Sequence, residues 1–259
     1  MKVLILSDIH GNWPALQAVL RAEQDVDQIL CLGDLVNYGP QPAECVVWAM
    51  QLHPPSRVIQ GNHDRAFAGI DPHCAPTNQR LAEAMQSATN HLLTPEMKHF
   101  LAALQPLQEF RCAETTCVAY HGTARDPHFP QVGGQNAQWP WESDIILTGH
   151  PDMLFVLVGH PDLLFLSHMP MKTRWGNTLV VNPGSVGLPA DGDPRAAYAV
   201  WQNGEVTLRR AAYDVEETAR AFELLTLAEH IKQLLVDGLR TGGSRTDSDK
   251  SKTAARVLV

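Results

Sequence analysis

A recurring pattern constrains the fold of this chain most strongly: a short apolar run is followed at once by Asp, Asn or His. It occurs four times, giving the clusters Asp8-Ile9-His10, Gly33-Asp34, Gly61-Asn62-His63-Asp64 and His121-Gly122. Apolar runs of this length, bounded by turn residues, are typical of buried strands. Because ligands bind at the carboxyl ends of the strands in α/β sheets, we expect the four clusters to converge on one site.

The segments around these clusters predict an α/β fold. Strands are predicted at residues 3–6, 28–32 and 57–60, separated by helices whose start signals are Asn12 and Pro42. This alternation favours a largely parallel sheet. Further helices are expected within residues 77–104, with Thr94-Pro95 as a start signal, and at 215–225 and 227–239; further strands are expected at 116–120, 145–147, 153–158, 163–166, 178–181, 197–201 and 206–210.

Length and charge limit the class of protein. The 259 residues suit one large domain, and we predict a single domain over residues 1–240 with a disordered tail at 241–259. The net charge of −8 gives no strong signal for nucleic acid or a membrane surface as a partner. Five cysteines without a C-x-x-C pair indicate a reducing compartment. With no apolar stretch long enough for a signal peptide or a membrane span, we expect a cytoplasmic protein. Its oligomeric state stays open.

The residue types in the four clusters favour a metal site. Asp, Asn and His supply oxygen and nitrogen ligands, and no cluster offers a thiolate. A carboxylate such as Asp34 can bridge two cations, and two cations ~3.5–4 Å apart can activate a water as nucleophile. His63 would then protonate the leaving oxygen, and Asp64 could orient His63. Each residue taken singly is more often a cap or turn residue; only their recurrence behind strands favours a site.

The clusters resemble the calcineurin-like metallophosphoesterase superfamily, whose pattern runs D-x-H, G-D, G-N-H-[DE], H and G-H-x-H. The segment Asn182-Pro183-Gly184-Ser185-Val186-Gly187 resembles, in addition, its small bacterial and archaeal phosphodiesterase branch. The resemblance covers about residues 1–225. It implies two mixed β-sheets packed face to face and flanked by helices, a four-layer αββα sandwich.

The same resemblance implies the roles of individual residues. Asp8 and His10 would bind one metal, Asn62 and His121 the other, and Asp34 would bridge the two. His63 would be the general acid and would also contact the phosphate. The cofactors would be two divalent ions, with Mn²⁺ expected and Fe, Ni or Zn as alternatives.

The final G-H-x-H element of the family is interrupted in this chain. Gly149-His150-Pro151-Asp152 recurs ten residues later as Gly159-His160-Pro161-Asp162, and Ser167-His168 follows. Removing the residues between either copy's histidine and Ser167 would restore the expected form. His168 is therefore predicted as the last ligand, with His150 or His160 as its partner. Asp152 or Asp162 could replace that partner, and one copy could instead be a hairpin turn.

The sequence thus predicts a metal-dependent hydrolase of phosphodiesters or phosphomonoesters. Its substrate would be a small phosphate ester, with a nucleotide among the candidates. The alternative is a non-catalytic scaffold with a degenerate metallophosphoesterase site, which the interrupted motif favours. A nuclease is a third hypothesis, and the acidic net charge argues against it.

Overall fold

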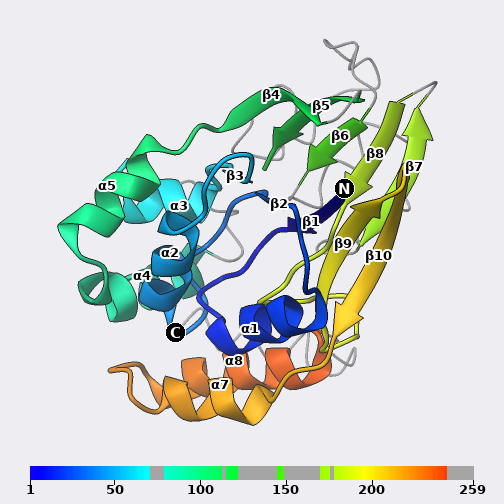
Figure 1. Cartoon of the computed structure of the whole chain (residues 1–259). Coiled ribbons are helices and arrows are strands. Elements are labelled where there is room, and N and C mark those ends of the chain that lie inside the picture. The colour runs from blue at the N-terminus through cyan, green and yellow to red at the C-terminus, as the bar shows by residue number, and fades with distance from the viewer. Residues whose placement is uncertain (71–78, 113–114, 122–144, 149–169, 176–177, 244–259) are drawn as a thin grey trace.

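Two five-stranded β-sheets pack face to face in the computed structural model, which describes residues 1–70, 79–112, 115–121, 145–148, 170–175 and 178–243 (Figure 1). The first sheet has the order β10 (Glu205–Ala211), β9 (Ala196–Gln202), β1 (Lys2–Leu6), β2 (Gln28–Cys31) and β3 (Arg57–Val58). The second has the order β4 (Leu107–Cys112), β5 (Thr115–Tyr120), β6 (Ile145–Thr148), β8 (Thr178–Asn182) and β7 (Met171–Trp175).

Both sheets are mixed, as the family resemblance implied. The strand pairs β1–β2 and β2–β3 are parallel, whereas β9 runs antiparallel to β1 and to β10. The prediction of a largely parallel sheet from the βαβ pattern was therefore wrong for β9 and β10. The β9–β10 pair has a local reason: Asn203-Gly204 connects the strands, both with positive φ (54° and 78°), and Asn-Gly with such angles favours a tight hairpin between antiparallel strands. The pairing of β9 with β1 joins residues almost 200 positions apart in sequence, so no local signal shows its direction.

Strand β1 is buried on both faces, and its alternating side chains belong to two different cores. Val3 and Ile5 pack between the sheets, in a cluster that includes Phe110 and Val181 of the second sheet. The intervening side chains of β1 pack on the other face of the first sheet, against α1 (Trp13–Ala22) and α2 (Pro42–Met50). This double burial explains why the strand is a continuous apolar run.

The predicted helix starts at Asn12 and Thr94 are confirmed. The Asn12 side chain accepts from the backbone N–H of Ala15 at 3.3 Å and caps α1, and Thr94 accepts from that of Met97 at 3.2 Å and caps α5 (Pro95–Ala103). The remaining described helices are α3 (Asn62–Phe67), α4 (Gln79–Thr89), the short 3₁₀ helix η1 (Asn90–Leu92), α7 (Val215–Phe222) and α8 (Glu229–Thr241).

Helices α7 and α8 follow the last strand and lie together beyond α1 in Figure 1. Together with α4 they form a third apolar cluster. The members of this cluster include Tyr38, Met85, Phe222 and Leu235. Helix α8 extends through Thr241, the residue at which the predicted tail begins. Within the described ranges, none of the helices combines the length and the apolar character needed to cross a membrane.

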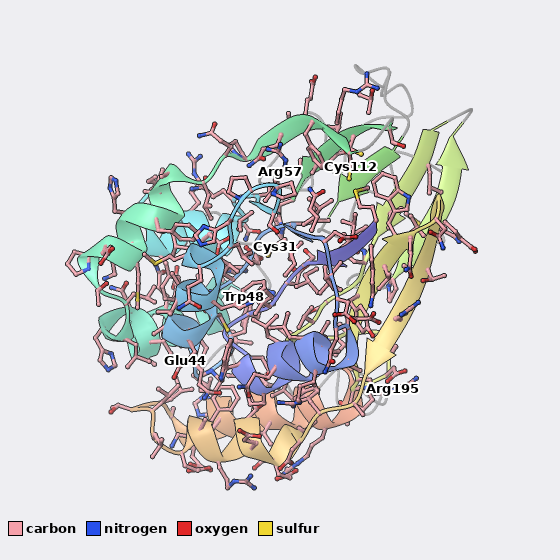
Figure 2. The ribbon with its side chains drawn as sticks, in the orientation of Figure 1. Cys31, Glu44, Trp48, Arg57, Cys112 and Arg195 are labelled. Carbon is pink, nitrogen blue, oxygen red and sulfur yellow. The ribbon has the colours of Figure 1, made fainter. Side chains whose placement is uncertain are left out.

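Two strands, β4 and β7, were not predicted from the sequence. The predicted strands at residues 153–158 and 163–166 lie outside the described residues, as does Cys74. The other four cysteines are buried and free of disulfides. Figure 2 shows Cys31 in the interior, whereas Glu44 and Arg195 lie near the periphery, and both of these are exposed.

Candidate metal centre

The strand ends of both sheets deliver the predicted site residues to one place. Asp8 follows β1, Asp34 follows β2, and Asn62 begins α3 just after β3. His121 comes directly after β5, so the second sheet contributes as well. All four side chains are buried, with at most 7% of their surface exposed. The convergence of strand ends that the sequence predicted is therefore present.

The distances show how closely these groups meet. One ligand atom each from Asp8, Asp34 and His121 lies within 4.8 Å of the other two. Three imidazoles approach the same oxygen, Asp34 Oδ2: its distance to Nε2 is 3.3 Å for His121, 3.9 Å for His10 and 3.9 Å for His63. His10 Nε2 is also 3.5 Å from Asp8 Oδ1. Asp34 therefore stands at the centre of the cluster, as a bridging ligand would.

The backbone of these loops is held in an unusual conformation. Asp8, His10 and Asp34 have φ values of 52°, 48° and 55°, in the left-handed region where Asp and His are tolerated better than most residues. Backbone hydrogen bonds join the two loops: Asp8 N–H donates to Gly33 O at 3.1 Å, and His10 N–H donates to Asp34 O at 2.9 Å. Such conformations cost energy and cluster at functional sites.

Carbonyl oxygens fix the orientation of two imidazoles. His10 Nδ1 lies 3.1 Å from Val36 O, and His121 Nδ1 lies 2.8 Å from Leu32 O. A carbonyl oxygen can only accept, so Nδ1 carries the proton in each ring. In the neutral ring, the Nε2 lone pair then faces the carboxylates, which is the arrangement of histidines that bind metals.

Charge in the cluster is balanced by the imidazoles. Burial opposes the charged form of His121, but the Asp34 carboxylate outweighs it and raises the pKa of His121 to about 10. Burial also opposes ionisation of Asp34, yet His121 and His63 hold its pKa well below the usual range. Without a cation, His121 thus supplies positive charge beside the carboxylate. The oxygen and nitrogen donors of Asp8, Asp34, His10 and His121 fit a divalent cation in the same space.

Residues 1–204 match the sequence model of the calcineurin-like phosphoesterase superfamily domain. The chain belongs to this superfamily. An uncharacterized protein of Methanocaldococcus jannaschii is 30% identical to this chain over 224 residues, which cover 83% of the chain and 89% of the relative. The phosphodiesterase YfcE of Escherichia coli K12 is 24% identical over 205 residues, which cover 78% of the chain and 88% of YfcE.

Structural similarity agrees with the sequence matches. The crystal structure of a metallophosphoesterase from Sphaerobacter thermophilus superposes with a TM-score of 0.71 at 29% identity, covering 93% of this chain and 99% of that one. The sandwich of two mixed sheets is thus the superfamily fold.

Asp64 has different partners from the one the sequence suggested. Its carboxylate accepts the backbone N–H groups of Asp34 and Leu35 at 2.8 Å each, and that of Gly61 at 3.0 Å. It therefore fixes the loop that carries Asp34, instead of acting mainly on His63. Gly61 is needed at this junction because a Cβ there would lie 2.1 Å from Asp34 Oδ1.

The ring of His63 is oriented by Asn37. The Asn37 Oδ1 accepts the N–H of Tyr38 at 2.9 Å, so its amide NH₂ faces His63 Nδ1 at 2.8 Å. Because that NH₂ donates, Nδ1 must accept, and the proton of the neutral ring is on Nε2, 3.9 Å from Asp34 Oδ2. Burial lowers the pKa of His63 to about 4, which keeps the ring neutral near pH 7. His63 thus carries one proton, directed into the site.

The segment that contains Ser185 supports the loop that carries Asp8 and His10, a role that the sequence did not predict. Ser185 Oγ donates to Asp8 O at 3.0 Å, and Gly187 N–H donates to the same oxygen at 2.9 Å. A Cβ on Gly187 would lie 1.8 Å from Ile9 O. The Asn-Pro-Gly-Ser-Val-Gly signature was the available signal, but its partner lies about 180 residues away in sequence.

The interrupted motif lies outside the part of the chain that the structure describes. His150, His160 and His168 are predicted ligands, and Asp152 and Asp162 are possible replacements. Their roles stay predictions.

Proposed function

We propose that this phosphoesterase hydrolyses phosphodiester or phosphomonoester bonds with two divalent cations at the candidate metal centre. The observation that carries the proposal is the position of Asp34 Oδ2 among the Nε2 atoms of His10, His63 and His121. A carboxylate with three imidazole nitrogens around one of its oxygens can serve as a ligand that two ions share.

The ligands would divide between two cations, for which Mn²⁺ is the first candidate and Fe, Ni or Zn are alternatives. Asp8 and His10 would hold one ion, and Asn62 and His121 the other. Asp34 would be shared by the two ions; its Oδ1 accepts the His63 backbone N–H at 2.9 Å, whereas its Oδ2 faces the imidazoles. His168, with His150 or His160, would complete the two ligand sets.

In this mechanism, His63 is the general acid. Two bound cations would lower the pKa of a water and stabilise negative charge on the phosphate. The chain itself supplies the proton: His63, after taking up a second proton to form the imidazolium, would give Nε2–H to the leaving oxygen and return to the neutral ring. Asn37 keeps that proton on Nε2, because its amide occupies Nδ1 as a donor. Burial lowers the pKa of His63 to about 4 in the protein without ligands, so the imidazolium form is a strong acid that releases its proton readily.

The substrate is proposed to be a small phosphate ester. Similarity to the E. coli phosphodiesterase supports diesters as the first class to test. The net charge of −8 does not favour a long nucleic acid as the substrate. Nucleotides are small phosphate esters and are therefore still candidates.

The test begins with protein stripped of metal by a chelator. We expect hydrolysis of bis(p-nitrophenyl) phosphate only after Mn²⁺ is added, with about two ions bound per chain. Asp34→Asn should lower kcat/KM by about a thousandfold or more, because it removes the shared charge from the centre. His63→Ala should cost about 100- to 10,000-fold, the usual range for a general acid.

His53→Ala is the matched control, because His53 is an exposed histidine outside the metal centre and should leave the rate unchanged. Wild-type activity in Asp34→Asn would remove the mechanism. Wild-type protein that binds no metal and hydrolyses no ester would instead support the scaffold hypothesis.

A further inference from the structure

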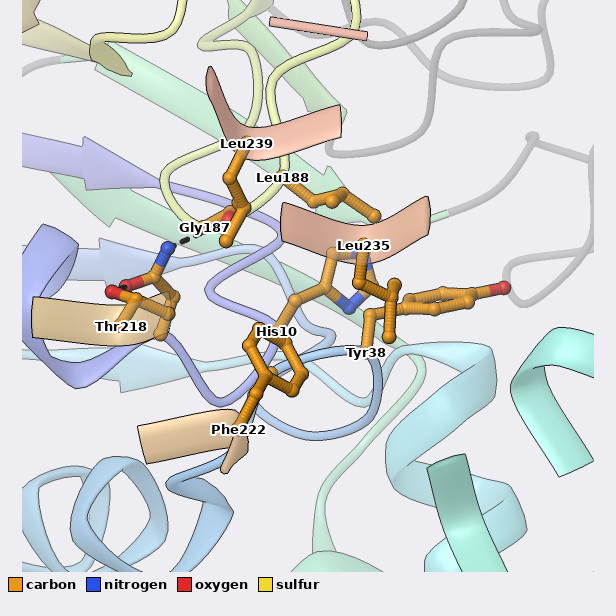
Figure 3. A pocket seen from close by; sticks show the side chains of 10 residues that line it. His10, Tyr38, Gly187, Leu188, Thr218, Phe222, Leu235 and Leu239 are labelled. Atoms are coloured by element: carbon orange, nitrogen blue, oxygen red, sulfur yellow. Dashed lines mark hydrogen bonds between the residues drawn. The ribbon is translucent and has the colours of Figure 1, made fainter. Parts of the chain in front are cut away.

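Helices α7 and α8 lie beyond residue 204, where the match to the superfamily domain ends, yet they pack against the metal centre. Figure 3 shows Phe222 of α7 and Leu235 of α8 beside His10 and Tyr38, and all four residues line one seam. As far as the described residues show, the seam leaves no space for a water molecule. Side chains of both C-terminal helices therefore line the same seam as His10, a predicted metal ligand.

Tyr38 is the residue of this seam that reaches both functional imidazoles. Its ring centroid is 5.0 Å from that of His10 and 4.9 Å from that of His63, with interplanar angles of 85° and 75°. The two imidazoles are themselves 5.4 Å apart. Edge-to-face contacts at these distances are attractive and restrict how each ring can turn. A displacement of Tyr38 would therefore be felt by the proposed acid and by a proposed ligand together.

The backbone of Tyr38 needs support from its surroundings. Asn37 and Tyr38 have φ values of 72° and 56°, and the left-handed region is unfavourable for a bulky aromatic residue. Such conformations persist only where the surrounding structure determines them. The support comes from the third apolar cluster, which includes Tyr38 and in which Phe222 and Leu235 are 1% and 3% exposed.

Two polar connections anchor the same helices to the site. Thr218 Oγ1 of α7 donates to Asn12 Oδ1 at 2.9 Å, and Asn12 Nδ2 donates to Gly187 O at 2.9 Å. At the end of α8, Gly192 N–H donates to Gly242 O at 2.8 Å, and a Cβ on Gly242 would lie 2.5 Å from the backbone of Asp193. Helix α7 is thus tied through Asn12 to the segment behind Asp8, and the end of α8 is tied to Gly192 and Asp193, a few residues beyond that segment.

The geometry points to Tyr38 as a positioning residue for His63, held in place by Leu235 of α8. Tyr38 keeps the His63 ring at the angle at which Nε2–H faces the site, and α8 keeps Tyr38 in its strained conformation. This inference rests on the proposed function, because it assigns Tyr38 a part in the transfer of the His63 proton. It makes the C-terminal helices part of the catalytic apparatus.

The activity test compares Leu235→Ala with Leu225→Ala. Both leucines belong to the third cluster and are buried, 3% and 9% exposed, but only Leu235 lines the seam. A misplaced acid affects poor leaving groups most, because they need the proton in the transition state. We expect Leu235→Ala to lower kcat for phenyl esters about tenfold more than for p-nitrophenyl esters, with KM nearly unchanged. Leu225→Ala should leave that ratio unchanged.

Tyr38→Leu gives a second variant in case Leu235→Ala does not fold. It keeps an apolar side chain in the cluster but removes the ring contacts to His10 and His63. In this variant too, kcat for phenyl esters should fall about tenfold more than kcat for p-nitrophenyl esters. An unchanged ratio in folded Tyr38→Leu would overturn the inference.

A spectroscopic readout tests the position of the ring without catalysis. In metal-free, ¹⁵N-histidine-labelled protein, long-range ¹H–¹⁵N spectra should show His63 with Nδ1 as acceptor and Nε2 protonated. The signals should broaden in Leu235→Ala and Tyr38→Leu and stay sharp in Leu225→Ala. If the wild type hydrolyses no ester, the proposed function fails, and these spectra still decide whether Tyr38 fixes the ring. Unchanged His63 signals in both folded variants would overturn the inference.

Discussion

The space between the two sheets and the metal centre at their edge are buried to the same degree but are built in opposite ways. Val3 and Ile5 are 0% exposed and pack in an apolar cluster of both sheets, whereas Asp8 and Asp34 are 1% and 2% exposed and bear carboxyl groups. Burial of apolar side chains stabilises the fold. Burial of carboxylates costs stability unless hydrogen bonds and opposite charge offset it. The comparison teaches that strand interiors hold the sandwich together, while strand ends are organised for a ligand.

Truncation in the intersheet core should have the largest effect on stability. Ile5→Ala is expected to lower the free energy of unfolding by about 2–5 kcal/mol, because it leaves a cavity between the sheets. Denaturant titration measures this loss, and Val47→Ala, at a side chain that is 40% exposed, is the control. Activity per folded molecule should be unchanged. A fall in kcat of the folded protein would show that the core and the centre are not separable.

Metal should stabilise the fold through the centre alone. Mn²⁺ at about 100 times its dissociation constant should add roughly 2.7 kcal/mol to the free energy of unfolding, since the ion binds the folded state. The shift in melting temperature should persist in Ile5→Ala and disappear in Asp34→Asn. If Asp34→Asn keeps the full shift, the ion binds elsewhere and the proposed centre is wrong.

The smallest effect is expected at Asn12, which links helix α1 to the segment behind Asp8. It caps α1 and also donates to the oxygen of Gly187 behind Asp8. Asn12→Ala should lower the free energy of unfolding by about 1 kcal/mol through the lost cap, and should lower kcat/KM by a few-fold. Thr94→Ala is the matched control, because it removes a similar cap from α5 away from the site. Equal losses of activity in both variants would refute a link from Asn12 to the loop that carries Asp8 and His10.

Much of the site could be predicted because its signals are local. Asp8, His10, Asp34 and Asn62 follow strands of the first sheet, and the ends of neighbouring parallel strands lie together. His121 follows β5 of the second sheet, so its place beside them depends on how the two sheets pack. Helix starts at Asn12 and Thr94 depend on hydrogen bonds three residues along the chain, so the sequence shows both partners. The same local reasoning failed for β9, which pairs antiparallel to β1, almost 200 residues away in sequence.

By itself, the sequence determined which residues end the strands and what chemistry they can offer, because strand length, cap and residue type are properties of short segments. Only the tertiary structure decided which groups those residues meet. The partners of Asp64, the contact of Asn37 with His63 and the support of Tyr38 by α8 join parts of the chain that are distant or whose spacing has no fixed pattern. The hydrogen bond from Thr218 to Asn12 spans 206 positions, and packing alone brings them together.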